Sequence, residues 1–141
     1  MVNYTKSCVF WKYYIILYEN IYSNMENENV FKLILSKEAD QFLLSLPSKA
    51  NEKIRSNIRR IQKGERDAEL FKKLENTEIW EFRTLYNKIA YRLFAFGDTE
   101  TDTLVIATHG IIKKTQKTPS KEIAKAEQFR KKYFENKKQE K

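Results

Sequence analysis

The sequence has 141 residues, 41% hydrophobic and 33% charged, with 3 glycines, 2 prolines and a net charge of +8. This length fits one domain, the composition excludes collagen-like, low-complexity and wholly disordered chains, and the charge favours a polyanion as partner. The single cysteine, Cys8, and single histidine, His109, exclude a disulfide framework, a structural zinc site and a Cys/His nucleophile pair, and they favour a reducing compartment.

The first 24 residues differ from the rest because they are rich in Tyr, Asn and Ile and nearly free of acidic groups. The apolar stretch 13–18 is too short to span a bilayer, and no small-residue cleavage site follows it. We interpret residues 1–24 as an N-terminal extension, either a peripheral element packed on the domain or translated upstream sequence. The functional domain is expected over residues 25–141, with Met25 as its start.

The next elements predicted along the chain are one strand and two helices. Residues 31–35 have strand character, and Ser36 is expected to cap a helix that ends at Pro47. A second helix over residues 48–63 carries isoleucines at helical spacing and stops at Gly64. The charged segment that follows, which contains Lys72 and Lys73, is expected to be a loop.

Three apolar, nearly alternating runs then predict an antiparallel meander, and a helix follows them. The runs span residues 79–85, 89–96 and 103–109. Thr118 is expected to cap the final helix, with Pro119 at its first position. The expected fold class is therefore α+β, a small domain with an N-terminal strand and helical hairpin, an antiparallel β-meander and a C-terminal helix.

The positive charge is concentrated at the C-terminal end of the chain. Residues 111–141 contain 11 basic and 4 acidic residues, whereas the preceding 110 contain 16 and 15. We interpret this excess as an electrostatic patch for a polyanion, although residues 137–141 fit a solvated tail equally well. The lysines expected to contact this polyanion, which is RNA if the resemblance described below holds, are Lys72, Lys73, Lys117 and Lys121.

Charged side chains interrupt the apolar strands of the meander. Period-two alternation places Trp80 and Phe82 on the core face, and Glu81 and Arg83 on the open face. Arg92 lies in a very apolar strand, and an unpaired buried guanidinium is costly. Its partner is either Glu81 on the neighbouring strand or an external anion.

The histidine lies where the third meander strand is expected to end. His109 precedes Gly110, which allows close approach of backbone, and the basic pair Lys113 and Lys114 follows. One carboxylate, one imidazole and several cations can therefore converge at one sheet edge. A purely structural histidine remains an equally good interpretation.

Three segments in this order resemble the RelE/HigB toxins, specifically their phage-derived HigB-like branch. They are Ile79-Trp80-Glu81-Phe82-Arg83, then Tyr91-Arg92-Leu93-Phe94, then His109-Gly110-Ile111-Ile112-Lys113-Lys114-Thr115-Gln116-Lys117-Thr118-Pro119. The resemblance covers residues 31–133. It implies a cytoplasmic toxin of a bacterial type II toxin–antitoxin module, with a microbial-ribonuclease-like fold. It also implies ribosome-dependent mRNA cleavage and a cognate antitoxin, usually a helix-turn-helix protein.

The resemblance also suggests roles for individual residues. Arg92 matches the arginine that such toxins place against the scissile phosphate, and Lys113 and Lys114 match the basic pair after the last strand. His109 matches the His-Gly pair of this branch, whose catalytic use varies. The C-terminal catalytic tyrosine of some relatives has no secure counterpart, since Tyr133 lies well inside the final helix.

Metal-free RNA cleavage needs a base for the 2′-hydroxyl, cations for the charge on phosphorus and an acid for the leaving 5′-oxygen. We hypothesise Glu81 as base and His109 as acid or positioning group. The anion-stabilising cations would be Arg83, Arg92, Lys113 and Lys114. The products would carry a 2′,3′-cyclic phosphate and a 5′-hydroxyl, and no cofactor or metal is expected.

Two other functions fit the same residues. The first is a non-catalytic RNA- or ribosome-binding protein in which Glu81 and Arg92 merely pair, and the second is a ribonuclease of related fold that works without the ribosome. DNA binding is disfavoured because no helix-turn-helix pattern is present and the basic residues follow a strand.

Overall fold

The computed structural model describes residues 29–101 and 103–139. The expectations for residues 1–24, a peripheral element or a non-native start before Met25, lie outside the described residues. The predicted order of elements is confirmed, with one further strand. In chain order the elements are β1 (Lys32–Leu35), α2 (Lys37–Ser45), α3 (Ser48–Gln62), β2 (Phe71–Lys73), β3 (Trp80–Tyr86), β4 (Ile89–Gly97), β5 (Leu104–Lys113) and α4 (Ser120–Gln139).

The five strands form one sheet in the order β1-β5-β4-β3-β2. Strands β2 to β5 form an antiparallel meander, and β1 pairs with β5 in parallel, so the sheet is mixed. The prediction of a loop around Lys72 and Lys73 is wrong, because these residues lie in β2 and pair with β3. A strand of only three residues is too short to show the alternation by which strands are found in a sequence.

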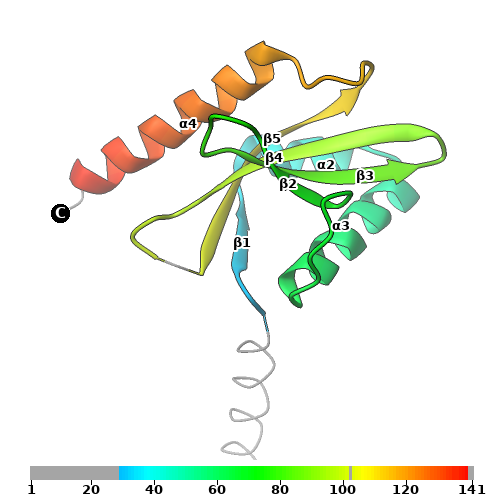
Figure 1. Ribbon diagram of the computed structural model, residues 1–141, viewed down its shortest axis with the longest axis horizontal. Helices are drawn as coiled ribbons and strands as arrows, with labels where there is room; N and C mark the ends of the chain where they lie inside the picture. The colour runs from blue at the N-terminus through cyan, green and yellow to red at the C-terminus, as the bar shows by residue number, and fades with distance from the viewer. Residues whose placement is uncertain (1–28, 102, 140–141) are drawn as a thin grey trace, which may run out of the picture.

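Helices cover both faces of the sheet, which gives three layers and confirms the predicted α+β class (Figure 1). On one face α2 and α3 cover a core that includes Leu43, Ile54, Ile58, Phe82 and Leu93. On the other face α4 covers a second core that includes Ile79, Phe94, Phe96, Ile106 and Ala126. Within residues 29–101 and 103–139, no helix is long and apolar enough to cross a membrane.

Local backbone chemistry explains where several elements begin and end. Ser36 caps α2 as expected, since its Oγ accepts a hydrogen bond from the Ala39 amide at 3.0 Å. Gly64 ends α3 with a φ of 100°, a conformation that favours glycine. Asn87 and Lys88 form the turn between β3 and β4 with φ values of 53° and 67°. Two positive φ values are typical of the two-residue hairpin turn that fixes strand register.

Two expected boundaries near the C-terminal end are wrong. Strand β5 continues to Lys113, so His109 lies inside the strand and not at its end. The strand continues because the N-terminal half of β4 supplies partners, and Lys113 lies opposite Ala90. Thr118 does not cap α4: the Pro119 carbonyl accepts from the Ile123 amide, and the Thr118 hydroxyl donates to a residue of the sheet.

Gly110 lets helix α2 approach β5 closely. A Cβ atom at this position would lie 2.2 Å from the nearest ring carbon of Phe42, on α2. The absence of a side chain therefore allows the Phe42 ring to rest directly on the strand backbone. The close backbone approach expected at this glycine is confirmed.

We predict that Gly110→Ala destabilises the fold by about 1–3 kcal/mol, because the new methyl group displaces the Phe42 ring. Gly97→Ala is the matched control, since a Cβ atom there meets nothing within 4 Å. Urea unfolding of both variants measures the difference. Equal stability of the two would contradict this packing.

Candidate functional site

The sheet register brings the charged residues of the meander together on the face that α4 partly covers. Arg83 on β3 lies directly opposite Arg92 on β4. Glu81 lies two residues before Arg83 on the same face, with its Oε1 3.4 Å from Arg83 Nε and 3.6 Å from Arg92 Nε. The expected pairing of Glu81 with Arg92 is therefore observed, but both arginines share the one carboxylate.

Glu81 is not on an open face, which corrects the sequence-based expectation. Its exposed fraction is 2%, because the segment that leads into α4 closes over it. From this segment Thr118, which is itself buried, donates a hydrogen bond from Oγ1 to Glu81 Oε2 at 3.0 Å. The carboxylate is thus held from two sides, by a hydroxyl at one oxygen and by two guanidinium groups at the other.

The two arginines keep unused hydrogen-bonding capacity. Arg92 is 8% exposed, and its Nη1 donates to the carbonyl of the neighbouring Tyr91 at 3.0 Å. The Nε atoms of Arg83 and Arg92 are buried and have no hydrogen-bond partner, because their contacts with Glu81 at 3.4 and 3.6 Å do not have the geometry of a hydrogen bond. Burial, and then the charge of Arg83, lower the pKa of Arg92. Such a pair of guanidinium groups is suited to bind an added anion.

A hollow of about 390 Å³ opens beside these arginines. Its charged lining consists of Arg83, Arg92, Lys113 and Lys114, and its other lining residues are Ala90, Thr115 and Gln116. Burial, and then the charge of Arg92, lower the pKa of Lys113. Four cations therefore surround a space next to one carboxylate, an arrangement that favours phosphate groups.

His109 is placed away from this hollow. Its ring stacks on Phe94 with centroids 4.9 Å apart, and Phe94 lies between Glu81 and His109 in the sheet register. Nε2 lies 2.9 Å from Glu122 Oε2, and Nδ1 lies 2.9 Å from Thr108 Oγ1. Burial lowers the pKa of His109 despite the nearby Glu122. The neutral ring then donates to Glu122 and accepts from Thr108, which links β5 to the first turn of α4.

The four lysines expected to contact RNA are all exposed, but they do not form one group. Lys72 lies opposite Glu81 in the register of β2 and β3, and its charge helps to lower the pKa of Lys113. Lys117 lies in the loop before α4 and Lys121 in its first turn. Lys73 lies elsewhere, with its Nζ 3.7 Å from Glu78.

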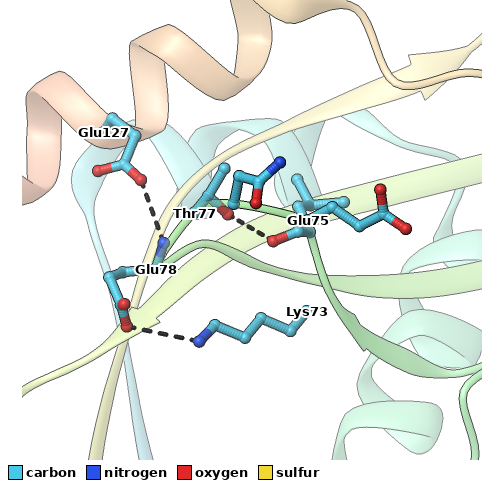
Figure 2. Close-up of a pocket in the computed structure, with 7 residues that line it drawn as sticks. Lys73, Glu75, Thr77, Glu78 and Glu127 are labelled. Carbon is cyan, nitrogen blue, oxygen red and sulfur yellow. Dashed lines mark hydrogen bonds and ion pairs between the residues drawn. The ribbon is translucent and has the colours of Figure 1, made fainter.

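The hollow beside Lys73 has a different chemistry (Figure 2). It has a volume of about 420 Å³ and is lined by three carboxylates, those of Glu75, Glu78 and Glu127. Glu127 accepts a hydrogen bond from the Glu78 amide at 3.2 Å, which ties the turn between β2 and β3 to α4. The acidic lining of this hollow disfavours binding of nucleic acid, so Lys73 is not part of the basic site.

Tyr133 also lies away from the basic hollow. Its hydroxyl donates to Asp98 at 2.7 Å, and Lys137 bonds the same carboxylate oxygen at 2.5 Å. Burial raises the pKa of Tyr133, and the hydrogen bond to Asp98 adds to this effect. Burial alone would raise the pKa of Asp98, but the bonds from Lys137 and Tyr133 outweigh it and lower this pKa. This cluster anchors the C-terminal half of α4.

The sequence interpretation missed Thr118, which holds the carboxylate beside the hollow. Its hydroxyl looked like a helix cap because a proline follows it. Nothing local to the sequence indicated that it bonds to a carboxylate 37 positions earlier. Among the described residues, no group of three or more His, Cys, Asp or Glu side chains is arranged to hold a metal ion.

Comparison with known proteins places the chain in a family. Residues 41–131, which include every residue that lines the basic hollow, match the family of the phage-derived protein Gp49-like (DUF891). The chain belongs to this Gp49-like family. The family is one of RelE/HigB-like toxins, so the resemblance noted in the sequence is confirmed.

Among solved structures, the fold is similar to a chain of the toxin–antitoxin complex RelBE2 from Mycobacterium tuberculosis. The sequence identity is 18% and the TM-score is 0.40, over 59% of this chain and 98% of that chain. No curated protein matches the sequence.

The buried state of His109 predicts a pH-dependent stability. The pKa of His109 in the folded protein lies below the ordinary 6.5. As the pH falls below 6.5, the unfolded chain therefore binds more protons than the folded protein does. The free energy of unfolding should therefore fall as the pH is lowered below 6.5. His109→Asn should have a flatter profile over this window, measured by urea unfolding at each pH. Parallel profiles for the two proteins would contradict this interpretation.

Proposed function

We propose that this Gp49-like protein is the toxin of a type II toxin–antitoxin module and cleaves mRNA on the ribosome without a metal ion. The main support is the position of Glu81 Oε1 between Arg83 and Arg92, 3.4 and 3.6 Å from their Nε atoms, beside the basic hollow. A carboxylate next to clustered cations supplies both a base and a binding site for the phosphate that reacts. The family membership supports the toxin assignment.

In the proposed reaction Glu81 takes the proton of the ribose 2′-hydroxyl. The 2′-oxygen then attacks phosphorus, the bond from phosphorus to the 5′-oxygen breaks, and a cyclic phosphate remains on the upstream fragment. Arg92 and Arg83 bind the nonbridging oxygens, where negative charge builds up in the transition state. Binding of the phosphate gives the unpartnered Nε groups the acceptors that Glu81 does not supply.

Lys113 is the best candidate for the acid that protonates the leaving 5′-oxygen. It lines the hollow, and the lowered pKa caused by burial and by Arg92 makes it a better proton donor at neutral pH than an ordinary lysine. His109 fits this role less well, because both of its ring nitrogens are engaged and it is buried. We propose that His109 positions α4 through Glu122.

The remaining basic residues would bind RNA outside the reaction centre. Lys72, Lys117 and Lys121 are exposed and fit contacts with mRNA or ribosomal RNA. The same positive surface suits a cognate antitoxin, expected to be a helix-turn-helix protein, that would cover the hollow. The proposed site of action is the cytoplasm, where the ribosome and the antitoxin would be encountered.

One observation favours a second candidate, a non-catalytic RNA-binding protein. Glu81 is 2% exposed and already engaged by two arginines and a threonine, which also suits a purely structural ion pair. Such a protein would bind RNA with a strong dependence on salt and would leave it uncut. The end-mapping experiment below separates the two functions.

We predict that expression without antitoxin arrests growth and creates new mRNA 5′ ends inside translated frames. Arg92→Ala should abolish both effects, because the arginine against the phosphate contributes on the order of 100-fold or more to the rate. Arg59→Ala, at an exposed site on α3, is the matched control and should remain fully toxic.

Growth curves and mapping of cellular 5′ ends measure these outcomes, and circular dichroism checks that Arg92→Ala folds. Arrest without new ends would favour the binding protein. Full toxicity of a folded Arg92→Ala variant would refute the proposed site.

A further inference from the structure

We infer that Thr118 is a positioning residue, which fixes the orientation of the Glu81 carboxylate and keeps Oε1 available as the base. This inference rests on the proposed function and adds a residue to its machinery. Thr118 itself does not line the basic hollow and does not touch the reacting atoms.

The geometry gives the two oxygens of Glu81 different partners. Oε2 accepts the Thr118 hydroxyl at 3.0 Å, in a contact where both side chains are buried. Oε1 faces Arg83 and Arg92 at ion-pair distance. A hydrogen bond between buried groups, one of them charged, is among the stronger ones in proteins. The carboxylate is therefore held in one orientation before any RNA binds.

Without this hydroxyl the carboxylate would be expected to turn. The terminal torsion of a glutamate is soft, so its carboxylate rotates easily when nothing restrains it. The nearby Nε groups of Arg83 and Arg92 lack hydrogen-bond partners, and a freed carboxylate would pair with one of these guanidinium groups through two parallel N–H···O bonds. Both the base and one phosphate-binding guanidinium would then be lost in a closed ion pair. The Thr118 hydroxyl prevents this by engaging Oε2.

Helix capping does not account for Thr118. The Pro119 carbonyl accepts the Ile123 amide, and the Thr118 hydroxyl points to the sheet and donates to Glu81. This contact also anchors the exposed loop that carries Lys114 and Lys117. One buried hydroxyl thereby connects the base on β3 with the basic loop that precedes α4.

The test compares Thr118→Val, which removes only the hydroxyl, with Thr118→Ser, which keeps it. Thr101→Val is the control, because Thr101 is exposed in the loop at the opposite end of β4 from the hollow. We expect Thr118→Val to lower kcat for mRNA cleavage on programmed ribosomes roughly 10- to 100-fold, with little change in KM. Thr118→Ser should recover most of the rate, and Thr101→Val should match the wild type.

A Glu81→Ala background shows whether Thr118 acts through Glu81. There, Thr118→Val should cause no further loss of rate, because the carboxylate it positions is absent. A wild-type rate for Thr118→Val would overturn the inference and leave the proposed function intact. Equal losses in Thr118→Val and Thr118→Ser, or a further loss in the Glu81→Ala background, would indicate a role unrelated to the carboxylate and would also overturn it.

Thermal unfolding of the same variants provides a readout that does not need catalysis. Thr118→Val should lower the Tm clearly in the wild-type background and much less in the Glu81→Ala background. If the wild type cuts no RNA, the proposed function fails, and the two Tm differences still decide whether Thr118 holds Glu81. Equal Tm losses in both backgrounds would show that Thr118 does not act through its hydrogen bond to Glu81, and would overturn the inference.

Discussion

The shared carboxylate of Glu81 is the constraint on which the rest of the site depends. The hairpin register places Arg83 directly opposite Arg92, and like charges in that position repel each other across the strands. Glu81 offsets this repulsion from 3.4 and 3.6 Å, and its removal would leave the two arginines without the counter-charge that they share. The centre of the sheet is thus stable without ligand and still has guanidinium groups available for an anion.

The layers around this ion pair explain why the site is open on one side only. Helix α4 covers the half of the sheet face that contains Phe94 and Phe96. The basic hollow lies over the other half, around Ala90 and Arg92, where α4 does not reach. His109 and Glu122 fix the start of α4 at the border between the two halves. Buried apolar packing therefore adjoins the charged hollow directly.

Much of this arrangement could be predicted from the sequence. Period-two alternation places Glu81 and Arg83 on one face of one strand, and the hairpin between β3 and β4 brings Arg92 beside them. Strand β2 was missed because three residues are too few to show a period. The extension of β5 through Gly110 to Lys113 was missed because a glycine and lysines resemble a loop, whereas β4 supplies the hydrogen-bond partners there.

The contacts that define the site depend on packing between distant segments. The bond between Thr118 and Glu81 forms only when the loop before α4 lies over the sheet. The position of His109 follows from the continuation of β5 and from the approach of Glu122, neither of which local sequence reveals. Sequence patterns therefore predicted that Glu81 and the four cations lie close together, while three-dimensional packing distinguishes the residues that line the hollow from those beside it.

The most direct test of the central claim, that Glu81 is the base of an RNA-cleaving site, is single-turnover cleavage of mRNA on programmed ribosomes. The purified wild type should produce fragments with 2′,3′-cyclic phosphate and 5′-hydroxyl ends. Glu81→Gln should bind the same complex but cut it at least about 100-fold more slowly. Equal rates for the two proteins, or fragments with 5′-phosphate ends, would contradict the account.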